Sequence, residues 1–125
     1  MSVRSYRDLI AWQKAMELTA LVYELTDKFP GEERFGLTLQ IRKAVVSIPS
    51  NIAEGQGRNS TKEFINHLSI SYGSLMETET QNLIAEMRQY ITNDESALVL
   101  NKSAEVGRLI NGLSNSLGRK ARSDR

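Results

Sequence analysis

The amino-acid sequence predicts an all-α protein that folds as an antiparallel up-down-up-down four-helix bundle. Four long stretches carry apolar residues at helical spacing, only two prolines occur in 125 residues, and no alternating strand pattern lies between turns. Connections of about 3–6 residues between long helices favour antiparallel neighbours. The length fits a single domain. We place the bundle at residues 1–118 and a basic, disordered tail at residues 119–125.

The first helix is expected from about Asp8 to Lys28, because Phe29-Pro30-Gly31 then ends it. Its apolar side chains cover about two thirds of the circumference, whereas a helix of a lone bundle needs a stripe of roughly 100°. We expect the excess to pack against a second subunit; the alternative is a wide core face with scattered surface leucines. The predicted interface residues are Ile10, Leu18, Leu21, Val22, Leu25 and Phe29.

The second helix is expected from about Glu33 to Gln56 and contains Pro49. Proline lacks an N–H and its ring crowds the carbonyl of Val45, at a cost of about 3 kcal/mol in a regular helix. We predict a kink at Pro49 that shapes the bundle, rather than a binding pocket; alternatively, one segment ends at Ser47 and another begins. The predicted core face of this helix is Leu37, Ile41, Val45, Ile48 and Ile52, and Gly55 and Gly57 end the helix. The polar side chains that can bond the backbone near the kink are Ser47, Ser50 and Asn51.

Two capping boxes mark the remaining helices. Ser60-Thr61-Lys62-Glu63 opens the third helix, which runs to about Tyr90, and Thr92-Asn93-Asp94-Glu95 opens the fourth, which Gly118 closes. Gly73, in the middle of the third helix, predicts a notch that another helix can approach closely. The packing seam of the fourth helix is Val99, Ser103, Val106, Ile110, Leu113 and Leu117.

Three runs of sequence resemble a known family. The run VSIPSNIAEG (46–55) is followed by Arg58, Ser60, Glu63-Phe64 and YGSLME (72–77), and YRDLIAWQKAM (6–16) precedes it. These blocks resemble the four-helix-bundle family of 23S rRNA intervening-sequence proteins, also called the S23 ribosomal protein family. The chain is also similar to the accessory variability protein of diversity-generating retroelements. The resemblance implies a homopentamer and nucleic-acid binding; residues 1–117, with twelve basic and fourteen acidic side chains, are less basic than those relatives.

The residues favour no catalytic chemistry. Cysteine is absent, which excludes thiolate sites, and His67 is the single histidine. It belongs to no Glu-x-x-His motif of a di-iron site and has no obvious paired serine and acid for a nucleophilic triad. Glu63 and His67 could share a metal ion, but two ligands do not form a cage. For Glu54, Glu77 and Glu79 we favour a structural polar network over acid–base catalysis. We therefore predict no enzyme activity, no metal and no cofactor.

Binding of other macromolecules remains the expected function. The primary hypothesis is a homo-oligomer, pentameric by resemblance, that binds RNA or DNA through the phosphate backbone. The alternative is an interaction scaffold whose partners are proteins only. No segment is expected to span a membrane and the amino-terminal residues do not resemble a signal peptide, so the expected location is the cytoplasm. The candidate phosphate contacts are Arg42, Lys43, Arg58, Lys62, Arg119, Lys120 and Arg122; the structural motif is Ser47, Pro49, Asn51, Glu54, Gly55, Gly73 and Glu77.

Overall fold

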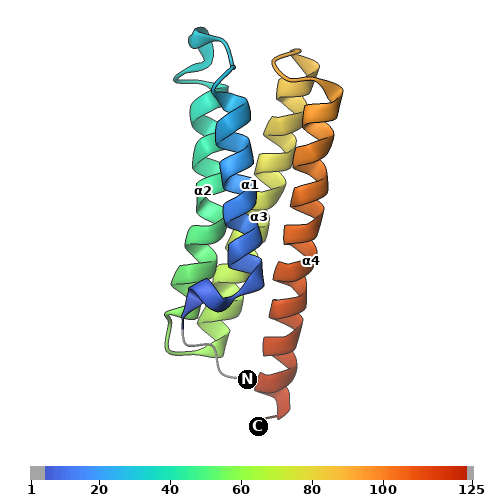
Figure 1. The fold of residues 1–125 in the computed structure, drawn as a ribbon. Coiled ribbons are helices and arrows are strands. Elements are labelled where there is room, and N and C mark those ends of the chain that lie inside the picture. Colours follow the sequence, from blue (N-terminus) through green and yellow to red (C-terminus); the bar gives the residue numbers. More distant parts are fainter. Residues whose placement is uncertain (1–4, 124–125) are drawn as a thin grey trace.

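The chain folds into a bundle of four α-helices, seen in a computed structural model that describes residues 5–123. The helices are α1 (Ile10–Thr26), α2 (Leu37–Gln56), α3 (Thr61–Met87) and α4 (Asn93–Ser123), with short 3-10 helices η1 (Tyr6–Asp8) and η2 (Gly31–Glu33). Neighbouring helices run antiparallel, and each packs against two others in the order α1, α2, α3, α4 (Figure 1). The predicted fold class is confirmed.

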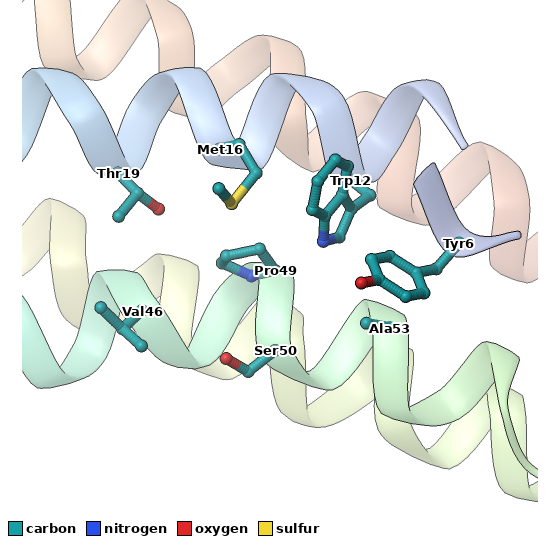
Figure 2. A pocket seen from close by; sticks show the side chains of 8 residues that line it. All are labelled: Tyr6, Trp12, Met16, Thr19, Val46, Pro49, Ser50 and Ala53. Carbon is teal, nitrogen blue, oxygen red and sulfur yellow. The ribbon is translucent and has the colours of Figure 1, made fainter. Parts of the chain in front are cut away.

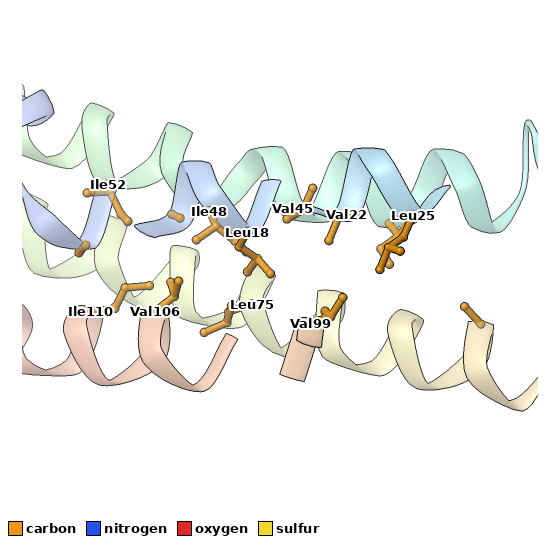
Figure 3. Close-up of a cluster of buried hydrophobic side chains, with 14 of the residues drawn as sticks. Leu18, Val22, Leu25, Val45, Ile48, Ile52, Leu75, Val99, Val106 and Ile110 are labelled. Atoms are coloured by element: carbon orange, nitrogen blue, oxygen red, sulfur yellow. The ribbon is translucent and has the colours of Figure 1, made fainter. Parts of the chain in front are cut away.

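The core is a column of aliphatic side chains along the bundle axis (Figure 3). The predicted core face of α2 is buried, with Ile48 and Ile52 fully covered, and so are Val99, Ser103, Val106 and Ile110 of the predicted α4 seam. The predicted capping box is complete at Thr92–Glu95 and half formed at Ser60–Glu63, where only the serine caps the helix. The Thr92 N–H donates to Glu95 Oε1 and the Glu95 N–H donates to Thr92 Oγ1, while the Glu63 N–H donates to Ser60 Oγ.

The predicted subunit interface on α1 is wrong for most of its residues. Leu18 and Val22 are no more than 1% exposed and Leu25 and Phe29 are 9% exposed, because this sector of α1 faces the bundle's own core. Leu21 is half-buried and packs against that core, so only Ile10, at 58% exposure, is free for a partner. A helical wheel identifies two apolar sectors but cannot say which one the other three helices cover.

Helix α2 continues through Pro49, so the alternative of two separate segments is excluded. The Val45 carbonyl, which loses the Pro49 N–H, lies 3.4 Å from the Thr19 hydroxyl of α1. Asn51 Nδ2 donates to both the carbonyl and the hydroxyl of Ser47, at 2.9 Å each. The Thr19 hydroxyl is shared with the Ala15 carbonyl at 2.8 Å, so it replaces the missing backbone bond of Val45 only in part, while the Asn51 bonds stabilise the neighbouring turn.

Helix α4 extends past Gly118 to Ser123. The tail expected at 119–125 is thus helical as far as the structure describes it, and Arg119, Lys120 and Arg122 lie on the last helical turns; residues 124 and 125 lie outside the described part. Leu117 packs against the core and Ala121 is half-buried beside α3, so packing outweighs the helix-ending tendency of glycine.

Candidate nucleic-acid interface

One end of the bundle collects most of the candidate phosphate contacts. The α2–α3 connection and the end of α4 both lie at the lower end of the molecule in Figure 1. We call this region the basic end and define it as Arg58, Lys62, Arg119, Lys120 and Arg122, all of which are exposed. Because α3 starts where α4 finishes, the antiparallel fold brings side chains together that are about 60 residues apart in sequence.

Lys62 and Arg122 line the same groove. This groove, of about 350 Å³, is bounded by the first turns of α3 and the last turns of α4, and its other lining residues are Ile65, Asn66, Gly118 and Ala121. The amino terminus of α3 and the carboxyl terminus of α4 meet here, so their helix dipoles oppose each other and the positive charge comes from the side chains. The arrangement can hold an anionic group between two cations over an apolar floor.

The cations of the basic end are mostly unpaired. Within residues 5–123, no carboxylate lies within ion-pair distance of Lys62, Arg119, Lys120 or Arg122, whereas Arg58 bonds to Glu54 at 2.7 Å. Residues 54–63 and 117–123 together carry five basic and two acidic side chains. The positive potential of this end is therefore not neutralised within the described fold.

Arg42 and Lys43 are not part of the basic end, since they lie in the other half of α2. Arg42 donates to Thr26 Oγ1 at 2.8 Å and to Asp27 at 3.0 Å, and its guanidinium stacks on the Tyr23 ring. These contacts tie α2 to α1, so Arg42 is a structural residue in the isolated chain. The expected phosphate contact at Arg42 would have to compete with them.

Lys43 is exposed beside a polar groove between α2 and α3. The groove also contains Glu77, an exposed carboxylate, and Gln81, whose Oε1 is buried without a hydrogen-bond partner. An acidic neighbour lowers the attraction of this site for phosphate. The structure thus separates the predicted phosphate contacts into the basic end and the pair Arg42 and Lys43. Only the groove at the basic end is lined by cations without a carboxylate.

The opposite end of the bundle, which we call the paired end, comprises residues 24–36 and 86–95. It carries three basic and seven acidic side chains. Glu33 accepts hydrogen bonds from the Leu37 N–H and from the Tyr90 hydroxyl, which lower the pKa of its carboxyl. Glu95 pairs with Lys28 and accepts from the Thr92 N–H, and these contacts lower its pKa as well. At the paired end, the carboxylates of Glu33 and Glu95 are therefore bonded within the fold.

A polar network joins α2 and α3 through the predicted motif. Asn51 Oδ1 lies 3.0 Å from His67 Nδ1, and Ser74 donates to the Ser47 hydroxyl. Since Asn51 Nδ2 already donates to Ser47, its Oδ1 accepts from His67, which assigns the proton to Nδ1. His67 Nε2 then lies 4.0 Å from Glu54. In this tautomer Nε2 carries no proton and makes no hydrogen bond to Glu54, whose bonded partner is Arg58, so Glu54 and Glu77 both lie outside the network. Glu79 accepts a hydrogen bond from Ser103 between α3 and α4.

Helix α2 ends at Gln56 with Gly57 as its C-cap, as predicted, and Gly55 in its last turn permits a close approach to α3. A Cβ at this position would lie 2.7 Å from the Cβ of His67 and 2.9 Å from the Phe64 ring. Gly73 shows the reverse, because a Cβ added there would have no neighbouring atom within 4 Å and the residue is exposed. The predicted notch at Gly73 is therefore not filled within the bundle.

The outer face of α3 is an apolar surface that the fold leaves uncovered. Its exposed fractions range from 36% at Met76 to 71% at Met87. Gly73 lies among these residues, so a helix from another chain could approach closely there. No single stretch of α3 looks unusually apolar, and this surface was missed in the sequence because the buried positions of α3 are mostly Ser, Thr, Asn and Ala. The face consists of Ile70, Met76, Leu83, Ile84 and Met87.

No metal-binding group is found in the described part of the chain, where no three or more His, Asp or Glu side chains converge. Glu63 and His67 face different partners, since Ser60 donates to Glu63 while His67 contacts Asn51. Residues 5–123 also contain no helix with enough length and hydropathy to cross a bilayer.

Comparison with known proteins gives one family. The family model described as "23S rRNA-intervening sequence protein" matches residues 7–112. A crystal structure of a Bacteroides thetaiotaomicron protein, described as having unknown function and as belonging to the S23 ribosomal protein family, is 26% identical with a TM-score of 0.78. The alignment covers 84% of this chain and 98% of that one. No curated protein matches significantly. Neither description assigns a catalytic role.

Proposed function

The chain belongs to the 23S rRNA-intervening sequence protein family, and from this premise we propose that it is a non-enzymatic, homo-oligomeric scaffold that binds RNA or DNA through the phosphate backbone. The observation that carries the proposal is the basic end, where Lys62 and Arg122 share one groove without an acidic neighbour lining it. Few aromatic side chains are available there for base stacking, so binding is expected to be weakly sequence-specific.

The proposed assembly is a pentamer, as the resemblance implies. The corrected candidate for the contact between subunits is the apolar face of α3, in place of the α1 sector that the core covers. An oligomer presents several basic ends together, so weak contacts at each one would sum through avidity. A near-neutral chain can in this way bind a polyanion.

The direct test is binding of a labelled single-stranded RNA of about 30 nucleotides, followed by fluorescence anisotropy over a salt series. Affinity should fall steeply between about 50 and 200 mM salt. The triple variant Lys62→Gln, Arg119→Gln, Arg122→Gln should weaken binding and reduce the slope of log K against log salt by about 2. The charge-matched control neutralises three exposed cations elsewhere, namely Arg34, Arg88 and Arg108.

Equal loss in the triple variant and in its control would reject the basic end as the site. No binding at low salt would reject the nucleic-acid function itself.

The second candidate is a scaffold whose partners are proteins only, and the uncovered α3 face favours it. Native mass spectrometry can show whether α3 or α1 forms the contact between subunits. Ile84→Glu should dissociate an oligomer that forms through α3, whereas Ile10→Glu, a charge at an exposed apolar position of α1, should not. An intact oligomer in Ile84→Glu, or dissociation by Ile10→Glu alone, would return the interface to α1.

A further inference from the structure

The last turns of α2 present two different faces to the helices beside them. Toward α1, Pro49 and Ser50 line an apolar groove of about 360 Å³ whose other wall carries the rings of Tyr6 and Trp12 (Figure 2). No charged side chain of residues 5–123 lines this groove. Toward α3, the same turns carry polar and charged side chains that face His67. The charged groups of these turns therefore lie between α2 and α3.

His67 lies on α3 opposite these turns and is the single histidine of the chain. Its side chain is 16% exposed, and its Nδ1 donates to Asn51 Oδ1 at 3.0 Å. In the neutral ring Nε2 is therefore the nitrogen without a proton, and it lies 4.0 Å from Glu54 Oε2. Two hydrogen-bond acceptors thus face each other across this gap, and a proton on Nε2 would make their interaction attractive.

Glu54 already has one cationic partner. Its Oε2 accepts a hydrogen bond from the Arg58 guanidinium at 2.7 Å. The same oxygen therefore has Arg58 beside it on its own helix and His67 beside it on α3. Within residues 5–123, Arg58 is the one cation of the basic end that pairs with a carboxylate. This pair weakens the attraction of Arg58 for a phosphate, because the hydrogen bond to Glu54 would have to be broken first.

We propose that protonation of His67 releases Arg58 and strengthens the binding of nucleic acid at the basic end. A proton from solvent converts the neutral imidazole into a cation and gives Glu54 a second positive partner. Arg58 is then held less firmly, and the basic end gains positive charge in the same step. Histidine suits this role because its charge changes between about pH 5 and 8. The proposal rests on the nucleic-acid function proposed above and adds a regulation to it.

The other charged groups near His67 do not offer the same coupling. Glu63 lies one turn earlier on α3, but it accepts a hydrogen bond from Ser60 at the start of that helix. Within residues 5–123, Glu54 is the only carboxylate within 4.0 Å of a ring nitrogen of His67, so α1 and α4 contribute none. Gly55 keeps the gap between the helices narrow, since a Cβ there would lie 2.7 Å from the Cβ of His67. The charge of the ring is therefore coupled to the ion pair on α2.

The coupling can be tested without nucleic acid, because proton NMR follows the ring of a single histidine through a pH titration. Glu54→Gln should lower the midpoint of this titration, since Arg58 then faces the ring unopposed, and Arg58→Gln should raise it. Each change should be roughly a few tenths of a pH unit, because both side chains are about half exposed. Glu24→Gln and Arg34→Gln, at exposed positions of the paired end, are the charge-matched controls. A midpoint that moves no more in Glu54→Gln than in Glu24→Gln would overturn the proposal.

The effect on binding is then measured by anisotropy with a labelled oligouridylate of about 30 nucleotides. In the wild type, affinity should rise as the pH falls from about 7.5 to about 5.5. The slope of log K against log salt should steepen by up to about 0.7, the contribution of one phosphate contact on a single strand. His67→Gln removes the titrating group and should bind equally at both pH values. Arg58→Gln should respond to pH less than the wild type does.

These outcomes separate the switch from the function on which it acts. Affinity that does not change with pH in the wild type, or an equal pH response in Arg58→Gln, would overturn the switch and leave the nucleic-acid function intact. No binding at either pH would reject that function and the switch with it. Circular dichroism confirms that each variant is folded, and Arg58→Gln, at an exposed position, keeps the test decisive if His67→Gln does not fold.

Discussion

The two ends of the bundle are stabilised by different forces. At the paired end, carboxylates are bonded to backbone and side-chain donors, as for Glu33 with Leu37 and Tyr90, and Phe29 packs against Tyr90. At the basic end, the helices approach closely at Gly55, and the neighbouring polar groups of Asn51 and His67 bond to each other. Ion pairs there are few, because Lys62, Arg119 and Arg122 have no carboxylate partner among the described residues.

This difference indicates which charges belong to the fold and which are free for a ligand. A cation that is bonded inside the fold, such as Arg42, loses those bonds if it turns to a phosphate. A cation without a partner incurs no such penalty. Burial alone does not separate the two groups, since the charged residues at both ends are largely exposed. Pairing does.

The largest expected effect tests close packing beside the basic end. Gly55→Ala should destabilise the protein by about 1–2 kcal/mol, because the new methyl group would lie 2.7 Å from the Cβ of His67 and would force α2 and α3 apart. Gly73→Ala is the matched control at an open position of α3 and should stabilise by up to about 1 kcal/mol. Urea unfolding measures both. Equal effects at the two glycines would contradict the close approach.

A smaller loss is expected from the polar network at the same end. Asn51→Ala removes the donor to Ser47 and leaves His67 Nδ1 without its acceptor, which should cost about 1 kcal/mol. Asn101→Ala, at an exposed position of α4, is the control and should change stability little. The comparison again uses urea unfolding. A cost at Asn51 no greater than at Asn101 would show that the network is solvated.

Acid should weaken the paired end more than the basic end. The folded-state pKa of Glu33 is lowered below its ordinary 4.5, first by the Leu37 N–H and then by the Tyr90 hydroxyl. Its stabilising contribution is therefore complete above pH 4.5 and is lost as the pH falls through the lowered pKa. Thermal unfolding between about pH 7 and 3 should show a smaller acid loss in Tyr90→Phe than in the wild type. An identical loss would mean that the Tyr90 bond contributes nothing.

The smallest effect is expected at Lys43. Because Glu77 shares its groove, Lys43→Gln should lower RNA affinity by no more than about twofold, less than Lys62→Gln does. Anisotropy at low salt measures both variants. A larger loss for Lys43 than for Lys62 would place the phosphate contact on the α2–α3 groove, as the sequence alone allowed.

The fold was predictable because its signals are local. Helical spacing, Pro30 and the two capping boxes determine where helices begin and end without knowledge of tertiary contacts. The predictions were wrong where residues distant in sequence determine which side chains are buried and where a helix ends. Leu18 belongs to the core because α2 and α4 pack against α1 and leave that sector facing the bundle axis, and α4 passes Gly118 because Ala121 packs beside α3.

The candidate site was only partly predictable for the same reason. Arg42 and Arg122 cannot be distinguished in the sequence, but Arg42 forms an ion pair with Asp27, fifteen positions away. The meeting of Lys62 with Arg122 follows from antiparallel α3 and α4, so the topology would have revealed it. The groove between Trp12 and Pro49 required the position of η1, which no periodic pattern indicates.

In a ring whose bundles lie parallel to the symmetry axis, the unequal distribution of charge along the bundle would give two distinct rims. In cyclic symmetry every protomer points the same way, so one rim would carry all the arginines of the α4 ends and the other all the carboxylates of the helix connections. A polyanion would be attracted to the first rim and repelled by the second. Such a ring would have a loading face, and nucleic acid would approach it from one side only.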